Sequence, residues 1–277
     1  MLWGRFASRA SEARYPQLWA GRVFAVCPSV QGPAGVNLYD TTGRGRHGIA
    51  TNVTTSTFWA RSQGQYAIEF DGTNDYVSAP NVQAFASGTQ LTVSAWVKRN
   101  SASVYAELVN KFSGTSAANE DGWLFRWDNG NKLLFTVANS GSYGQYLATN
   151  ANTSTAWNHV AAVHEFGTTA KTAIYLNGVA IAASWTTGGT QVPDADGTSY
   201  PIIMGAQRYA ATSYNLWAGQ MDDVAVFNRI LTPGEIKLLA TRRGIAYEAR
   251  RDIVFGTSGG FKAYWAQRSA LIGSGVY

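Results

Sequence analysis

Charged residues, cysteine and histidine are scarce in this chain. Of its 277 residues, 14% are charged and 45% are hydrophobic, which provides enough apolar material for one large core. Cys27 is the only cysteine, so an intrachain disulfide is excluded, and this is typical of a reducing compartment. A zinc site is not expected either. His159 and His164 are five residues apart on a predicted strand, so they should point to opposite faces of its sheet.

Long apolar runs are also missing. Residues 1–22 contain four arginines and one glutamate, but no apolar run long enough for a secretion signal. No later segment reaches the length that spans a membrane. We therefore expect a protein that is made and folded in a cytoplasm and has no membrane partner.

Positive charge is confined to the two ends of the sequence. Residues 1–22 carry a net charge of +3 and residues 241–277 carry +4, whereas residues 23–240 carry −2. The basic residues are separated by apolar ones and no nucleic-acid motif lies between the ends, so nucleic-acid binding is not expected. The pattern predicts an N-terminal arm at 1–22, one domain at 23–240 and a basic, aromatic C-terminal arm at 241–277.

Strand signals dominate the predicted domain. Apolar and polar residues alternate over residues 91–98, which is the period of a half-buried strand. Asn177-Gly178 lies between two apolar runs and predicts a tight hairpin, because a type I′ turn needs positive φ at both central residues. Residues 128–131, with the sequence DNGN, mark a second hairpin.

One helix is predicted after the last strand. Thr232 can cap it, Pro233 suits its first position, and Glu235 completes a capping box. Gly244 provides a stop signal at its C-terminal end.

Four segments occur in an order that is found in one kind of β-sandwich. They are YAIEFDGTNDYV at 66–77, QLTVSAWVKR at 90–99, WNHVAAVH at 157–164 with YLNGVAIA at 175–182, and GQMDDVAVFNRILTPGEI at 219–236. Over residues 16–240 the chain thus resembles the laminin-G-like, concanavalin A-like jelly-roll family, in its pentraxin-related branch. The resemblance implies an all-β, two-sheet antiparallel sandwich that a short helix closes. Function stays open, because this fold hosts lectins, adhesion modules, hydrolases and structural domains.

Calcium is the one metal that the sequence suggests. The candidate ligands are Asp71, Asn74 and Asp75 in one loop and Asp222 and Asp223 on a later strand, since calcium takes six to eight oxygen ligands. The resemblance adds that many relatives bind calcium at a rim of the sandwich, although this chain lacks the Glu-Gln-Asp ligand run of pentraxins. The alternative is that these side chains only bond backbone amides in turns.

Aromatic residues are abundant and many fall in or beside predicted loops. Sugar rings stack on flat aromatic faces, and the chain has ten Trp and fourteen Tyr. Our candidates for a glycan-binding face are Trp123, Trp127, Tyr143, Trp185, Tyr209, Tyr214 and Trp217. The alternative is that they pack in the core or at its rims.

Catalysis is not expected. The concanavalin-type glucanases that the chain resembles carry their acids on an alternating E-x-D-x-E strand. Glu69 and Asp71 match the first two positions, but Thr73 replaces the third acid and Gly72 interrupts the strand. Glycoside hydrolysis needs two carboxyl groups that face one cleft.

The two arms contain large apolar residues and arginines that favour contacts. The candidate assembly residues are Trp3, Phe6, Arg250, Arg251, Phe261, Tyr264, Trp265 and Arg268. Segments this aromatic are poorly suited to disorder, so they should pack on a partner or, alternatively, on their own domain. The AYWAQR segment at 263–268 and the opening at 15–48 also resemble laminin-G-like proteins encoded among the structural genes of tailed phages.

Two functions follow from these patterns. The first is a non-catalytic structural protein of a tailed-phage virion, assembled in the host cytoplasm, which self-associates and is held by its arms on capsid or tail proteins. The second is a soluble, calcium-assisted lectin that binds surface glycans. The truncation of both arms separates them, because it should abolish assembly but spare sugar binding.

Overall fold

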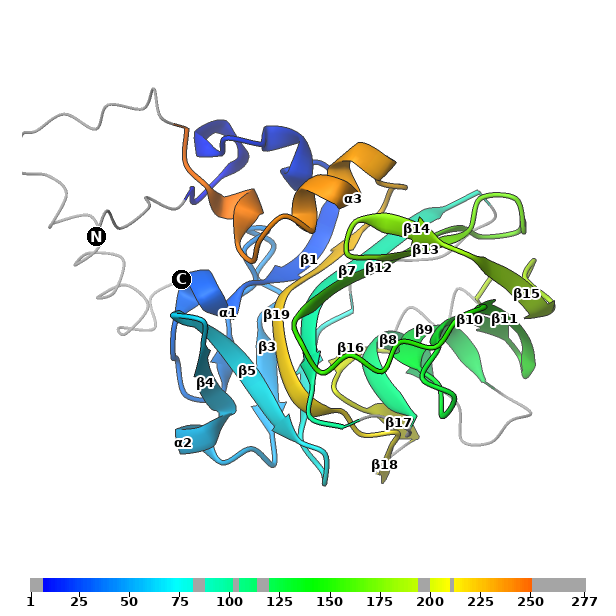
Figure 1. Ribbon diagram of the computed structural model, residues 1–277, viewed down its shortest axis with the longest axis horizontal. Helices are drawn as coiled ribbons and strands as arrows, with labels where there is room; N and C mark the ends of the chain where they lie inside the picture. Colours follow the sequence, from blue (N-terminus) through cyan, green and yellow to red (C-terminus); the bar gives the residue numbers. More distant parts are fainter. Residues whose placement is uncertain are drawn as a thin grey trace, which may run out of the picture.

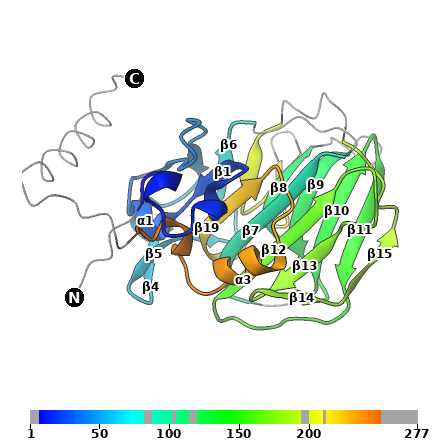
Figure 2. The ribbon, with the colours of Figure 1, turned by 90° about the horizontal axis from the view of Figure 1, so that it is seen from above.

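The computed structural model describes residues 7–81, 88–101, 105–113, 120–193, 200–209 and 212–250 (Figure 1). Two antiparallel sheets form a sandwich, so the predicted all-β jelly-roll architecture is confirmed. Figure 2 shows the two sheets from above, with α3 beside the strands of the first sheet. Among the described residues, no helix is both long and apolar enough to cross a membrane.

The first sheet has eight strands within the described residues. In spatial order they are β14 (Val179–Ile181), β13 (Ala173–Leu176), β12 (Asn158–Glu165), β7 (Gln90–Arg99), β19 (Ala218–Phe227), β5 (Gln65–Asp71) and β4 (Trp59–Ser62), and β1 (Arg22–Val26) also pairs with β19. The second sheet contains β15 (Ala183–Thr187), β11 (Ser142–Ala148), β10 (Leu133–Asn139), β9 (Asp121–Trp127), β8 (Ala106–Ser113), β16 (Ile202–Met204), β6 (Tyr76–Ala79), β3 (Gly48–Thr51) and β2 (Asn37–Leu38).

Short elements complete the fold. A separate hairpin consists of β17 (Gln207–Tyr209) and β18 (Thr212–Tyr214), and the α-helices are α1 (Pro28–Gln31), α2 (Thr55–Phe58) and α3 (Pro233–Leu239). Short 3-10 helices lie at Ala10–Glu12, Pro16–Trp19 and Ile245–Tyr247.

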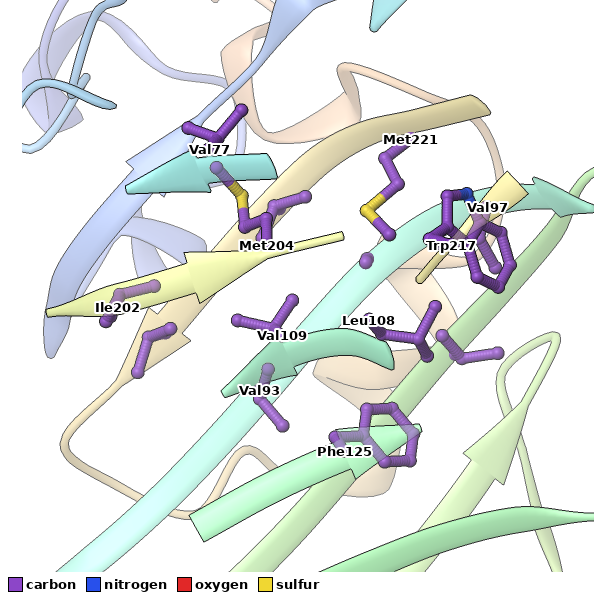
Figure 3. Packing of buried hydrophobic residues seen from close by; sticks show 14 of the residues in the cluster. Val77, Val93, Val97, Leu108, Val109, Phe125, Ile202, Met204, Trp217 and Met221 are labelled. Atoms are coloured by element: carbon purple, nitrogen blue, oxygen red, sulfur yellow. The ribbon is translucent and has the colours of Figure 1, made fainter. Parts of the chain in front are cut away.

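The main core lies between the two sheets. Val93 and Val97 of β7 face Val109 of β8 and Phe125 of β9 (Figure 3). Alternate residues of each strand point into this layer, because successive side chains of a strand lie on opposite faces.

A second apolar cluster covers the outer face of the first sheet. Leu18, Ile236, Leu239 and Tyr247 pack there with Phe227 of β19. Strand β7 is therefore covered on both faces, and the half-buried strand predicted at 91–98 is buried along most of its length. Its outer face is covered by α3 and by the described parts of the terminal segments.

The described parts of the two arms contact each other and the domain. The backbone amide of Ala7 donates to Tyr247 O at 2.6 Å, and that of Arg14 donates to Glu248 O at 2.7 Å. Arg250 has an exposed side chain, and its backbone amide donates to Glu12 O at 2.9 Å. Residues 7–22 and 241–250 thus pack on their own chain, which is the alternative that the sequence left open. The other assembly candidates lie outside the described residues: Trp3, Phe6, Arg251, Phe261, Tyr264, Trp265 and Arg268.

The predicted turn and helix signals have clear outcomes. Asn177 and Gly178 have φ of 51° and 81°, which confirms the tight hairpin between β13 and β14. Thr232 Oγ1 accepts from the amide of Glu235 at 3.2 Å, and the Glu235 carboxylate accepts from the amide of Thr232 at 2.8 Å, so the capping box is confirmed. The stop at Gly244 is wrong for α3, which ends at Leu239; Gly244 has φ of 72° and precedes the last 3-10 helix instead.

Candidate functional site

A pocket of about 410 Å³ opens on the face of the second sheet that points away from the core. We call it the outer pocket. Its lining residues are Tyr105, Phe112, Glu120, Leu124, Arg126, Thr136, Tyr143, Gln145, Gln207, Tyr214 and Asn215.

Side chains that alternate with core residues along neighbouring strands form the floor of the outer pocket. Three large side chains of β9 belong to the core between the sheets: Trp123, Phe125 and Trp127. Leu124 and Arg126 alternate with them and therefore face the other side. In the strand register, Thr136 of β10 pairs with Leu124, and Gln145 of β11 pairs with Thr136. The floor thus comes from three neighbouring antiparallel strands.

The β17–β18 hairpin forms a polar wall beside this floor. It contacts β8, and the backbone amide of Glu107 donates to Asn215 O at 2.8 Å. The Asn215 side chain donates from Nδ2 to Gln207 Oε1 at 2.8 Å, and Arg126 donates from Nη1 to the same oxygen at 3.3 Å. These bonds join the hairpin to β8 and β9, so the wall and the floor are held together.

Exposed tyrosines surround the outer pocket. Tyr105, Tyr143 and Tyr214 are 40%, 43% and 46% exposed, and they are the only exposed large aromatic side chains among the described residues. All three line the pocket. The Arg126 guanidinium lies 4.9 Å from the centre of the Tyr105 ring, within the range of a cation–π contact. Ring faces and amide groups therefore gather at one place.

A buried carboxyl group lies beside Arg126, next to the pocket. Glu107 of β8 pairs with Arg126 in the β8–β9 register and is fully buried. Burial raises the pKa of Glu107 to about 8, although the positive charge of Arg126 acts in the opposite direction. The carboxyl group is therefore mostly neutral at pH 7.

The structure corrects three of the seven glycan candidates. Trp123, Trp127 and Trp217 are at most 1% exposed and belong to the core, where the rings of Trp127 and Trp217 lie 5.8 Å apart. Figure 3 shows Trp217 next to Val97 of β7. Trp123 and Trp127 are on the inward side of β9, so they fill the sandwich and cannot contact a ligand.

The remaining glycan candidates divide into two groups. Tyr143 and Tyr214 both line the outer pocket, although they are 71 positions apart in the sequence. Trp185 of β15 is half-buried instead, and its ring packs on Tyr146 at 5.2 Å and on His164 at 5.7 Å. The side chain of Tyr209 lies outside the described residues.

Sequence reasoning missed most of the polar lining of the pocket. Arg126 did carry a signal, because it is the one charged residue within the GWLFRW run of β9 and must face away from the tryptophans. No local signal marks Tyr105, Gln145 or Asn215, since their position depends on strand pairing and on the hairpin.

The five calcium candidates do not form one site. In the strand register, Asp71 pairs with Ala218 at the start of β19, whereas Asp222 is four residues further along that strand. A strand rises about 3.3 Å per residue, so the two groups are about 13 Å apart. Within the described residues, no group of three or more His, Cys, Asp or Glu side chains could hold a metal ion. The joint site proposed from the sequence is therefore wrong in its geometry.

The loop residues of that proposed site form hydrogen bonds with backbone amides instead. Asp71 Oδ1 accepts from the amide of Thr73 at 2.7 Å, and Asp75 Oδ2 accepts from the amide of Asp71 at 3.0 Å. Asn74 is exposed in the same loop. These bonds shape the turn. Calcium binding at the loop alone stays a prediction.

Asp222 and Asp223 lie in a buried polar cluster on the outer face of the first sheet. Asp222 Oδ1 accepts from the amide of Ser29 at 3.1 Å, and its Oδ2 is 3.6 Å from Arg243 Nη1. Asp223 Oδ2 accepts from the amide of Gly244 at 3.1 Å. Burial, together with the charge of Asp223, raises the pKa of Asp222 to about 7. The cluster joins β19 to α1 and to the C-terminal segment.

The two histidines of β12 pack against aromatic rings. His159 stacks edge-on against Trp96 on the outer side of β12, whereas His164 packs against Phe135 and Phe166 on the core side. The predicted opposite faces are confirmed. Burial lowers the pKa of His159 to about 3 and that of His164 to about 4, so both rings are neutral at pH 7.

The sandwich and its outer pocket define a lectin-like fold. A laminin G-type family model, described as the Concanavalin A-like lectin/glucanases superfamily, matches residues 71–237, which is more than half of the chain. The chain belongs to this superfamily. No sequence among the curated proteins matches it.

Solved structures with the same fold come from binding domains and glycosidases. The binding domain of Paraclostridial Mosquitocidal Protein 1 has a TM-score of 0.60 and 17% identity over 81% of this chain and 52% of that one. Domain 4 of AbnA, an extracellular arabinanase of Geobacillus stearothermophilus solved with arabinotriose, has a TM-score of 0.56 and 19% identity over 79% of this chain and 98% of that one.

A further match is to a sialidase. The Trypanosoma rangeli sialidase in complex with sialic acid has a TM-score of 0.54 and 14% identity over 80% of this chain and 33% of that one. The chain thus spans about half of the toxin binding domain and about a third of the sialidase. At these identities the matches establish the fold alone.

Proposed function

We propose that this protein is a non-catalytic carbohydrate-binding protein and that the outer pocket is its sugar site. The observation that carries the proposal is the convergence of all three exposed large aromatic side chains of the described residues, Tyr105, Tyr143 and Tyr214, on one pocket. Ring faces of this kind stack on sugars, and pockets that bind small ligands add a few well-placed polar groups. Gln145, in the floor, is one such group.

The similar structures agree with this proposal. The AbnA domain was solved with arabinotriose, and the chain covers nearly all of that domain. A domain of this size and fold can therefore bind a sugar by itself. The mosquitocidal protein and the botulinum neurotoxins of serotypes G and D use related folds as binding domains.

The proposal of a non-catalytic role rests on the acids of the pocket. Glu120 is the only carboxyl side chain among the lining residues that the structure describes. Hydrolysis of a glycosidic bond needs a second carboxyl group about 5 to 10 Å away in the same cleft. Glu107 pairs with Arg126 in the β8–β9 ladder, but it is fully buried and does not line the pocket.

Ring-removing substitutions test the sugar site. The variants Tyr143→Ala and Tyr214→Ala should each weaken binding of a sugar identified by glycan-array screening by about 1 kcal/mol, or about fivefold in Kd by calorimetry. Ile49→Ala, which removes an exposed side chain on the same sheet outside the pocket, is the matched control. The proposal fails if all three variants bind the sugar as well as the unmodified protein does.

Attachment to a phage particle is a second candidate function. It is supported by residues 251–277, which contain five aromatic residues together with two arginines and one lysine. Under this proposal the segment holds the protein on capsid or tail proteins of a virion assembled in the host cytoplasm, or on a second copy of the chain. The phage origin and the pentraxin-related branch stay predictions that arise from the resemblance.

Removal of residues 251–277 tests this second function. The cut leaves residues 7–22 and 241–250 in place, because they pack on the sandwich. The full chain should form a defined oligomer by light scattering, and the shortened chain should be a monomer that still binds sugar. Equal masses for the two proteins would remove the support for an assembly role.

A further inference from the structure

The outer pocket has opposite charges at its two ends. Its charged lining residues within the described part of the chain are Glu120, just before β9, and Arg126, near the end of β9. They are six positions apart, which corresponds to about 20 Å along an extended strand. A ligand that lies along β9 therefore meets an acidic group at one end and a guanidinium group at the other.

The guanidinium group is held in place but is not neutralised. Arg126 donates from Nη1 to Gln207 Oε1 at 3.3 Å and lies over the Tyr105 ring. Within the described residues, no carboxylate forms an ion pair with it. Its Nε is buried, so a ligand can reach only the terminal nitrogens, of which Nη1 also donates to Gln207.

The nearest acid does not remove this positive charge at neutral pH. Glu107 faces Arg126 across the β8–β9 ladder, but burial keeps its carboxyl group mostly protonated. The other groups around Glu107 are neutral: Asn110 is on its own strand, Gln207 is on β17, which contacts β8, and Asn215 follows β18. The neighbouring strand β16 contributes apolar residues. Among the described residues, Arg126 is thus the charged group that acts on Glu107.

We infer that the Arg126 end of the outer pocket binds the carboxylate of an acidic sugar, while the tyrosines stack on the sugar rings. The inference rests on the proposed function and specifies its class of ligand. Arginine suits this role, because its planar guanidinium group can donate two parallel hydrogen bonds to one carboxylate. The partly uncompensated charge inside a pocket favours an anionic ligand over a neutral one of the same shape.

Because Glu107 pairs with Arg126, the preference for acidic over neutral sugars should also depend on pH. Above about pH 8 the Glu107 carboxyl group loses its proton, and the new negative charge beside Arg126 opposes the binding of a second carboxylate there. The preference for acidic sugars should therefore weaken as the pH rises from 6.5 to 9.5. The binding of neutral sugars should not follow this change.

A matched pair of ligands tests the inference. The probes are trigalacturonate and its methyl ester, which has the same rings but no charge, and sialyllactose with its methyl ester. Calorimetry gives a Kd for each probe at pH 6.5. For at least one pair, the acid should bind ten times or more as tightly as its ester, and the pair that does so distinguishes uronic from sialic acids.

Variants then assign the preference to specific residues. Arg126→Gln should bring the ratio of the two Kd values close to one, and Arg126→Lys should restore part of it, because lysine keeps the charge but not the planar fork. Glu107→Gln should keep the preference at pH 9.5, where the unmodified protein loses several-fold of it. Thermal melting of each variant checks that it is folded.

The outcomes separate the inference from the function on which it rests. If esters and acids bind equally and Tyr143→Ala weakens both, the sugar site stands and the acidic ligand is wrong. If Arg126→Gln keeps the full preference, the inference is also wrong. If no probe binds and glycan screening finds no ligand for the folded protein, both the proposed function and this inference fail.

Discussion

The two outer faces of the sandwich differ in what covers them. On the first sheet, α3 and the described parts of both terminal segments bury Leu18, Ile236 and Tyr247 against β19. On the second sheet, the outer face holds an open pocket with three exposed tyrosines. The inner faces share one core. The pocket leaves part of the second sheet's outer face open to a ligand.

Two arginines show the same contrast. Arg243 lies 4.2 Å from the centre of the Trp157 ring, is 4% exposed, and is 3.6 Å from the buried Asp222 carboxylate. Arg126 also lies over an aromatic ring, yet it lines a pocket and has no ion pair among the described residues. Arg243 thus holds parts of its own chain together, whereas Arg126 is left for a partner outside the chain. Four predictions test this difference, from the largest expected effect to the smallest.

Removal of a core tryptophan should be far more harmful than removal of a pocket tyrosine. Trp127→Ala should lower the free energy of unfolding by about 3 to 5 kcal/mol, because it leaves a cavity between the sheets. Tyr143→Ala should change it by less than about 1 kcal/mol, since the ring is 43% exposed. Urea unfolding measures both. Similar losses in the two variants would contradict the assignment of core and pocket.

Removal of the buried arginine should have the next largest effect. Arg243→Met leaves the Asp222 carboxylate buried without its cation and should cost about 3 kcal/mol at pH 7.5 by urea unfolding. The cost should be smaller at pH 5, because Asp222, with a pKa of about 7, is then mostly protonated. Arg242→Met is the control: it removes an ion pair with Glu248 whose arginine is 51% exposed, and should cost less than about 1 kcal/mol. Equal costs for the two arginines would refute the structural role of Arg243.

Glu107 should make the stability of the whole protein fall at alkaline pH. Its pKa rises from 4.5 to about 8 on folding. Between these values the folded state keeps a proton that the unfolded chain releases, so the free energy of unfolding falls by up to about 1.4 kcal/mol for each unit of pH. The contribution is complete below pH 4.5 and is lost as the pH rises through 8. Glu107→Gln should remove the part of this slope that Glu107 contributes and leave the part from Asp222, whose pKa is about 7, as urea titrations at pH 5 and pH 8 can measure. An unchanged slope would mean that a group other than Glu107 binds the proton that the folded state keeps.

Calcium should have the smallest effect. The Asp71–Asp75 loop offers two carboxylates that already accept backbone hydrogen bonds, so any site there is weak, with a Kd of about 1 mM or more. At about 1 mM calcium such a site stabilises the fold by at most about 0.4 kcal/mol. Thermal melting with calcium and with chelator measures this. A shift of many degrees that Asp75→Asn abolishes would show a strong loop site.

Local patterns in the sequence predicted the architecture but only part of the site. The Asn177-Gly178 turn and the Thr232 capping box depend on residues that are close in the sequence, and both are confirmed. Tyr143 and Tyr214 were predicted for the glycan face and do meet in one pocket. Trp127 was predicted for the same face and is in the core. Residue type was a poor guide here, because a tryptophan serves a core and a sugar site equally well.

The sequence by itself determined the strands, the tight turns and the helix cap, since each arises from the preferences of neighbouring residues. It also determined that β9 has two unlike faces, because Arg126 alternates with large aromatic residues. Only the tertiary structure decided which aromatic side chains stay exposed and which of them meet. Tyr105, Tyr143 and Tyr214 come together through strand pairing and a hairpin over β8. Burial depends on what packs against a face, and no local pattern in the chain carries that information.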